Sequence, residues 1–259
     1  SNEDAFQLAA RGDTPMNVVA VVQHTSGEYL GLMEDHLEGR RIRFQYFRPF
    51  AGGRSLPAPD VAADALLLLG GGPWGSAGER DLPTLAEEVE LTRAVLASGT
   101  PVIAIGLGAQ ILAIAAGGRT ESRALTFEML SVTRTDDEAL NGFLPASFHQ
   151  VVYMRDWPVP PADARVLAAD AAGRPVVWQV GDNAYGFAGN PGIKLGMIED
   201  LIMEFEEVAP DAAASLEELR GLQPALEDAL VPIMTGLVQC TSLMSSPKAA
   251  VAAGSALDT

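Results

Sequence analysis

One segment near the middle of the chain limits the folds open to it. Residues 101–113 read PVIAIGLGAQILA, which is a short apolar run, a glycine-rich turn and the start of an apolar helix. A strand that passes through a sharp turn into a helix is the geometry by which α/β enzymes present a nucleophile. The apex of this turn is Gly106, which has no side chain. The segment therefore predicts an α/β fold with a strand-turn-helix unit of the kind that carries a nucleophile. No nucleophilic side chain stands at the apex of this turn.

Apolar runs alternate with amphipathic stretches through the first half of the chain. This alternation predicts a doubly wound, flavodoxin-like α/β fold, with a mostly parallel sheet and helices on both faces. Apolar runs with few charges are typical of strands that are buried on both faces of such a sheet. The expected strands are 16–23, 41–48, 65–69 and 101–105, and the expected helices are 27–37, 82–98 and 109–116.

The second half of the chain changes character and predicts a small antiparallel extension of the sheet. Short strand candidates with turn signals between them lie at 130–134, 151–154, 165–169, 176–180 and 184–188, and two terminal helices are expected at 196–208 and 214–243. We expect a single α/β domain over 16–244. It is flanked by an N-terminal tail over 1–15 and a flexible, Ala/Ser/Gly-rich tail over 245–259.

The composition excludes several classes of function. A net charge of −17 disfavours binding to a phosphate backbone or to an anionic membrane surface. Cys240 is the only cysteine and the chain has three histidines, so we expect no intrachain disulfide, no metal site and no cofactor. No apolar run is long enough to span a bilayer, and residues 1–6 lack the features of a signal peptide. An acidic protein of the cytoplasm is the expectation.

Two glycine-rich turns follow neighbouring strands of the predicted sheet. Residues 70–73 read GGGP and residues 106–108 read GLG. Ligands bind at the carboxyl edge of open α/β sheets, and glycine lets backbone N–H groups face a ligand. The amides of Gly72 and Leu107 are candidates for an oxyanion hole. The alternative is that these glycines only permit tight turns and close packing.

Landmarks along residues 16–240 occur in the order found in one enzyme family. They are VVQH at 21–24, GGP at 71–73, LPTL at 82–85, the segment 101–110, GG at 117–118, FE at 127–128 and YGF at 185–187. With these landmarks the chain resembles the class I glutamine amidotransferases. Domains of this family release ammonia from glutamine and pass it to a synthase, so the resemblance implies a synthase partner.

The resemblance also implies a Cys-His-Glu triad, and this chain lacks all three members. The cysteine attacks the glutamine amide, the histidine moves the proton and the glutamate orients the histidine. The corresponding positions hold Gly106, Asn190 and Gly192. Glycine and asparagine provide neither a nucleophile nor a base at neutral pH. We therefore expect no glutaminase activity.

Several polar and aromatic residues are candidates for lining the old pocket. Gln110, Trp74 and Tyr153 match or adjoin family positions, and His24 follows the first strand with Glu28 close behind it. Each of them could equally serve packing or turn support.

Three functions remain open. The first is a non-catalytic binding or partner subunit, whose partner would be a synthase or another protein. The second is an enzyme that uses the old pocket for a different reaction, as in specialised metabolism. The third is a sensor or carrier of an amino-acid-like or anionic small molecule.

Overall fold

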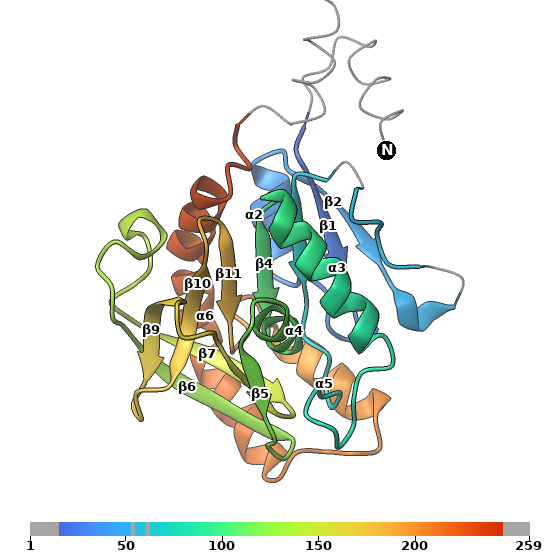
Figure 1. The fold of residues 1–259 in the computed structure, drawn as a ribbon. Helices are drawn as coiled ribbons and strands as arrows, with labels where there is room; N and C mark the ends of the chain where they lie inside the picture. Colours follow the sequence, from blue (N-terminus) through green and yellow to red (C-terminus); the bar gives the residue numbers. More distant parts are fainter. Residues whose placement is uncertain (1–15, 53–54, 61–62, 246–259) are drawn as a thin grey trace, which may run out of the picture.

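The computed structural model describes residues 16–52, 55–60 and 63–245. Its centre is a nine-stranded sheet with the order β2-β1-β3-β4-β11-β10-β9-β6-β7 (Figure 1). The first five strands in this order are parallel, and they follow the 2-1-3-4-5 arrangement of flavodoxin-like folds. These strands are β1 (Val18–Val22), β2 (Arg43–Phe47), β3 (Ala65–Leu68), β4 (Val102–Ile105) and β11 (Ala184–Phe187). The predicted fold class is confirmed.

Strands β6 (Thr126–Arg134), β7 (Ser147–Met154), β9 (Arg165–Asp170) and β10 (Pro175–Val180) continue the same sheet from the edge of β11. This antiparallel part has longer strands than expected at β6 and β7, and the segment expected there at 184–188 is instead β11, which extends the parallel strands by pairing with β4. A separate ribbon pairs β5 (Arg119–Glu121) with β8 (Trp157–Val159). The sequence analysis missed this ribbon because its strands are three residues long and carry no clear alternation.

Helices cover both faces of the sheet, as predicted. Helices α3 (Leu85–Ser98) and α4 (Leu107–Ala115) lie in front of the sheet in Figure 1 and pack on one face of β3 and β4. Helices α2 (Met33–Gly39) and α6 (Ala212–Cys240) pack on the other face. Helix α5 (Leu195–Glu204) packs with Val151 and Tyr153 of β7 in a third apolar cluster.

Two helices differ from their predicted bounds in ways that matter for the site. The helix expected over 27–37 begins only at Met33, because Gly31 adopts a left-handed φ of 61° and residues 27–32 form turns. The helix expected at 196–208 ends at Glu204, and Phe205 is extended. At both places a non-helical segment lies where a helix was expected. Glu28 in the first segment and Phe205 in the second contact Gly72 at the carboxyl edge of the sheet.

The expected tails fall almost entirely outside the described residues, at 1–15 and 246–259. Within the described part of the chain, no helix is long and apolar enough to cross a membrane.

The carboxyl edge of the parallel strands collects the candidate site residues. β1 leads to His24, β3 to Gly70, β4 to Gly106 and β11 to Asn190. These strands are neighbours in the sheet, so loops far apart in the sequence meet there. Helix α5 lies on this side of the sheet in Figure 1.

Candidate functional site

The turn between β4 and α4 has the geometry of a nucleophile elbow. Gly106 has φ 58° and ψ −117°, a region that residues with a side chain rarely adopt. Its N–H donates to the carbonyl of Phe187 in β11 at 2.9 Å, and its own carbonyl accepts from Gln110 at 3.2 Å. The turn is thus fixed on one side to the neighbouring strand and on the other to the first turn of the helix.

Gly106 has space around it for a side chain. A Cβ atom added there would lie 3.4 Å from the Cα of Gly70 and 4.0 Å from the Sδ of Met154, which are ordinary contact distances. Gly106 is also partly exposed. The obstacle to a side chain at this apex is its backbone conformation and not a lack of space.

The loop after β11 is closed by its own contacts. The Asn190 N–H donates to the carbonyl of Val151 at 2.8 Å, and its side-chain Oδ1 accepts from the N–H of Gly192 at 2.8 Å. Such a bond from asparagine to the backbone two residues on is a turn-forming contact. A Cβ added to Gly192 would lie only 2.9 Å from the Cγ of Met33. Asn190 therefore holds its own loop, and Met33 takes the space beside position 192.

His24 forms a buried ion pair with Glu88 of α3, and both side chains are fully buried. His24 Nε2 lies 2.5 Å from Glu88 Oε1, and its Nδ1 lies 3.3 Å from the carbonyl oxygen of Gly70. Thr84 donates its hydroxyl to the second oxygen of Glu88 at 2.6 Å. Burial alone would lower the pKa of His24, but the Glu88 carboxylate outweighs it and the pKa is raised. Since both ring nitrogens lie near oxygen acceptors, the surroundings of His24 favour the protonated ring.

Glu28 lies on the other side of Gly70. Its Oε1 accepts the N–H of Gly72 at 2.8 Å, and its side chain is buried. Burial raises the pKa of Glu28 to about 7, although the Gly72 hydrogen bond and the charge of His24 act in the opposite direction. A Cβ added to Gly70 would lie 1.9 Å from Glu28 Oε2, so the carboxylate rests directly on this glycine.

The last turn of α5 and the segment after it cover the glycine turn from outside. A Cβ added to Gly72 would lie 3.2 Å from Leu201 and 3.4 Å from the ring of Phe205. The guanidinium of Arg80 lies 5.0 Å from the ring centroid of Trp74 and 5.6 Å from that of Phe205.

The same segment is fixed by an acidic residue that pairs with two arginines. Glu207 accepts from Arg80 at 2.8 Å and also pairs with Arg155. Arg155 in turn donates to the carbonyl of Pro73 at 2.9 Å. Segment 201–207 and the turn at 70–75 are therefore held together by stacking and by charge.

The remaining predicted pocket residues take part in packing or bracing. Gln110 is fully buried, accepts from the Ser76 hydroxyl at 2.5 Å and donates to the carbonyl of Arg155 at 2.7 Å. Leu107 packs its side chain beneath Gly71. Tyr153 stacks edge-on against Phe127 at 5.4 Å between ring centroids.

The structure thus brings Gly72 and His24 together with Gly106 around Gly70. It places Trp74, Gln110 and Tyr153 on the flanking turn, helix and strand.

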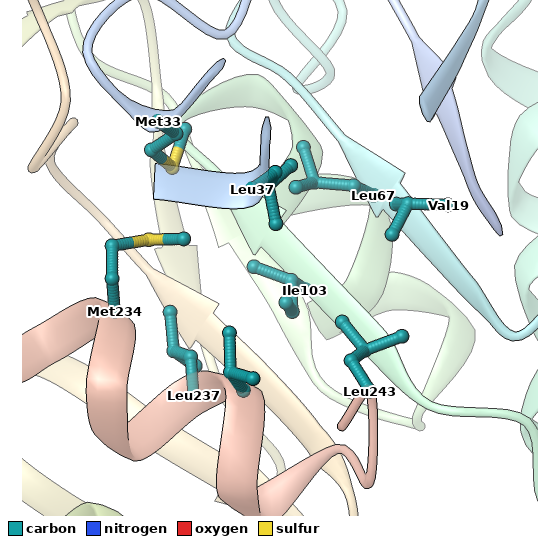
Figure 2. Close-up of a pocket in the computed structure, with 9 residues that line it drawn as sticks. Val19, Met33, Leu37, Leu67, Ile103, Met234, Leu237 and Leu243 are labelled. Carbon is teal, nitrogen blue, oxygen red and sulfur yellow. The ribbon is translucent and has the colours of Figure 1, made fainter. Parts of the chain in front are cut away.

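Two hollows lie away from the elbow. One is an apolar gap between the sheet and helices α2 and α6, where Ile103, Leu67 and Met234 face one another (Figure 2). All of its lining residues are apolar, so it offers no group that could orient a ligand. The other is a surface groove between Leu56 and helix α3. The described residues contain no group of three or more His, Cys, Asp or Glu side chains that could hold a metal ion.

Sequence reasoning missed Glu88, although the pattern contained a signal. Glu88 lies on the apolar stripe of α3, one turn from Leu85 and Thr92, and is 0% exposed. A carboxylate on the buried face of an amphipathic helix requires a partner, and His24 was a candidate. The pairs of Glu207 join segments distant in the sequence, and no local pattern predicts them.

Comparisons with known proteins agree with this architecture. The Peptidase C26 family model matches residues 74–153, which include α3, the elbow and most of β7. A glutamine amidotransferase from Methylobacillus flagellatus is similar with a TM-score of 0.73 and 20% identity, over 87% of this chain and 95% of that one. A glutamine amidotransferase from Thermotoga maritima is similar with a TM-score of 0.72 and 22% identity, over 87% of this chain and 98% of that one. The chain has a class I glutamine amidotransferase-like fold. No curated protein matches its sequence.

Other glutamine amidotransferase-like structures are more distant. A putative GMP synthase subunit from Thermoplasma acidophilum is similar with a TM-score of 0.51 and 17% identity, over 81% of this chain and 98% of that one. These chains are covered almost completely, so the likeness extends over a whole amidotransferase-like unit.

Proposed function

We propose that this protein is a glutamine amidotransferase-like subunit that lacks glutaminase activity and acts by binding a partner. The observation that carries the proposal is the elbow itself. Gly106 keeps the φ of 58° and ψ of −117° at the strand-to-helix turn, and it presents no nucleophile. Asn190 and Gly192 stand at the positions of the histidine and glutamate that the resemblance assigns. A covalent mechanism of acyl transfer needs a nucleophile and a base, and these positions supply neither.

The surroundings of the triad positions support a lasting loss of the chemistry. Met33 occupies the space beside Gly192, and the Asn190 side chain is bonded to its own loop. Glu28 takes the N–H of Gly72, the amide predicted from the glycine-rich turn as part of an oxyanion hole. Restoring a cysteine alone would therefore leave the base, the orienting carboxylate and the free amide missing.

Support for a partner comes from the comparisons and from the surface. Similar chains include a putative subunit of GMP synthase and a chain of the PurLQS structure from Thermotoga maritima, so this fold occurs in assemblies. In this chain Met203 is 85% exposed on α5, the helix that covers the site. An exposed methionine is typical of adaptable contact surfaces. We propose a synthase or a related enzyme of the cytoplasm as the partner, bound over α5.

Cross-linking tests this proposal. The tagged chain is expressed in its source cells and cross-linked, and the linked peptides are identified by mass spectrometry. We expect cross-links from α5 to a synthase, and we expect Met203→Glu to remove them. The matched control is Met244→Glu, which changes another exposed methionine, 61% exposed, beyond the far end of α6. A chain that stays monomeric without cross-links, or equal loss in both variants, contradicts the proposal.

A further inference from the structure

A buried carboxylate lies beside the elbow. Glu28 is 4% exposed, and its Oε1 accepts the Gly72 N–H at 2.8 Å. Burying an ionisable carboxylate costs free energy unless polar partners compensate. The backbone N–H of Glu28 is itself held by the Thr25 hydroxyl at 3.1 Å, so the residue is fixed at both its main chain and its side chain. The side chain is therefore buried, and its one hydrogen bond holds Oε1 at the amide of Gly72.

The surroundings of Glu28 form a built site for one carboxyl group. His24 contributes a positive charge from the side of β1, and Glu88 lies behind it and balances that charge. Glu204 and Tyr153 are the other titratable groups that face Glu28 electrostatically, from α5 and β7. The glycine at position 70 leaves the space that Oε2 takes, since a Cβ there would lie 1.9 Å away.

The site is also covered. Leu201 and Phe205 pack over Gly72. A Cβ atom added to Gly72 would lie 3.2 Å from the Cδ2 of Leu201. Phe205 is held in place by Arg80. A site closed by side chains and satisfied by an internal carboxylate offers no free donor to an external ligand.

We propose that the Glu28 side chain fills a carboxylate site at the amide of Gly72 in the native protein, and that a small monocarboxylate can bind there once Glu28 is removed. The inference rests on the proposed loss of catalysis and deepens it, because it explains why the old pocket is satisfied without substrate. An external carboxylate of the size of formate or acetate binds only when Glu28 is withdrawn. The hydrogen bond that it then makes replaces the one from Glu28 Oε1.

Chemical rescue tests the inference. Glu28→Ala removes the carboxylate and leaves Gly72 without its acceptor. We expect this variant to have a lower Tm than the wild type, and we expect sodium acetate to raise its Tm in a saturable way. Sodium chloride and sodium sulfate at the same ionic strength should raise the Tm of this variant no more than they raise that of the wild type. The wild type and Glu28→Gln, in which the site stays filled, are the matched controls and should show no specific response to acetate.

Several results would overturn the inference. An equal response to acetate in Glu28→Ala and Glu28→Gln, or an equal response of Glu28→Ala to acetate and sulfate, means that no carboxylate site exists. If Glu28→Ala folds in acetate but not in the other salts, the result supports the inferred carboxylate site.

If Glu28→Ala folds in neither salt, a pH titration of the Gly72 amide proton followed by NMR tests whether Glu28 occupies the site. We expect its proton shift to move with pH in the wild type and to stay constant in Glu28→Gln, whereas a shift independent of pH in the wild type refutes the occupancy. Neither measurement depends on ammonia release, so this inference and the proposed function fail separately.

Discussion

Replacing Glu28 by glutamine isolates the cost of burying its charge. The glutamine side chain would keep a carbonyl oxygen for the Gly72 N–H but would have no proton to lose. In the wild type, burial raises the pKa of Glu28 from 4.5 to about 7. The folded state therefore holds the proton more tightly than the unfolded state, and stability is lost as the pH rises from the unfolded pKa through the folded one.

The size of the effect follows from the pKa change. Each pKa unit corresponds to about 1.4 kcal/mol. The wild type should therefore lose about 2–3 kcal/mol of unfolding free energy between pH 5 and pH 8 that Glu28→Gln retains. The raised pKa of His24 gives stability that is present below 6.5 and is lost as pH rises through its folded value. Most of this second contribution is shared by both proteins, because Glu88 and the Gly70 carbonyl raise the His24 pKa more than Glu28 does, so their difference reports mainly on Glu28.

Urea unfolding at several pH values measures this difference. We expect the two proteins to diverge as the pH rises, with Glu28→Gln the more stable at pH 8. The control is Glu87→Gln, which changes an exposed carboxylate on α3 that does not act on the pKa of Glu28. It should keep the pH dependence of the wild type. Parallel curves for Glu28→Gln and the wild type would refute the reasoning.

Three other perturbations have defined outcomes. Glu88→Ala leaves the imidazolium of His24 buried without its partner and should cost about 3–5 kcal/mol in urea unfolding; a loss below about 1 kcal/mol contradicts the ion pair. Glu207→Ala should increase hydrogen exchange in the chain after α5 while the global Tm changes little; unchanged exchange there means that its pairs do not hold the segment. Gly106→Cys, made with Cys240→Ser, should lose about 1–3 kcal/mol to its positive φ. It should also react with a thiol reagent and still release no ammonia from glutamine, and turnover would contradict the loss of the other triad members.

Strands β1, β3 and β4 could be predicted because each is a short apolar run, and β2 could be predicted from its alternation. β11 was expected in the antiparallel extension, but it pairs in parallel with β4. The run at 101–105 and the glycine at its end correspond closely to β4 and Gly106. The antiparallel half was underestimated, since its pairing depends on contacts between distant segments.

The candidate site could be predicted only in outline. The glycine turns and His24 follow from their places after strands. The role of Glu28 could not be predicted, because a helix was expected over 27–37 and a helix would have pointed this residue elsewhere. The left-handed Gly31 interrupts that helix, and the turn before it carries the carboxylate to Gly72. The contact between Glu28 and Gly72 was therefore not predicted, because the left-handed conformation of Gly31 was not predicted.

Hydrolysis of amide-¹⁵N-labelled glutamine, followed by NMR on the purified chain, tests the central claim most directly. The elbow at Gly106 has no nucleophile, and the positions at Asn190 and Gly192 have no base and no carboxylate. We predict that labelled ammonium appears no faster than in buffer, at any glutamine concentration. Release that saturates with glutamine and scales with the amount of protein would contradict the claim.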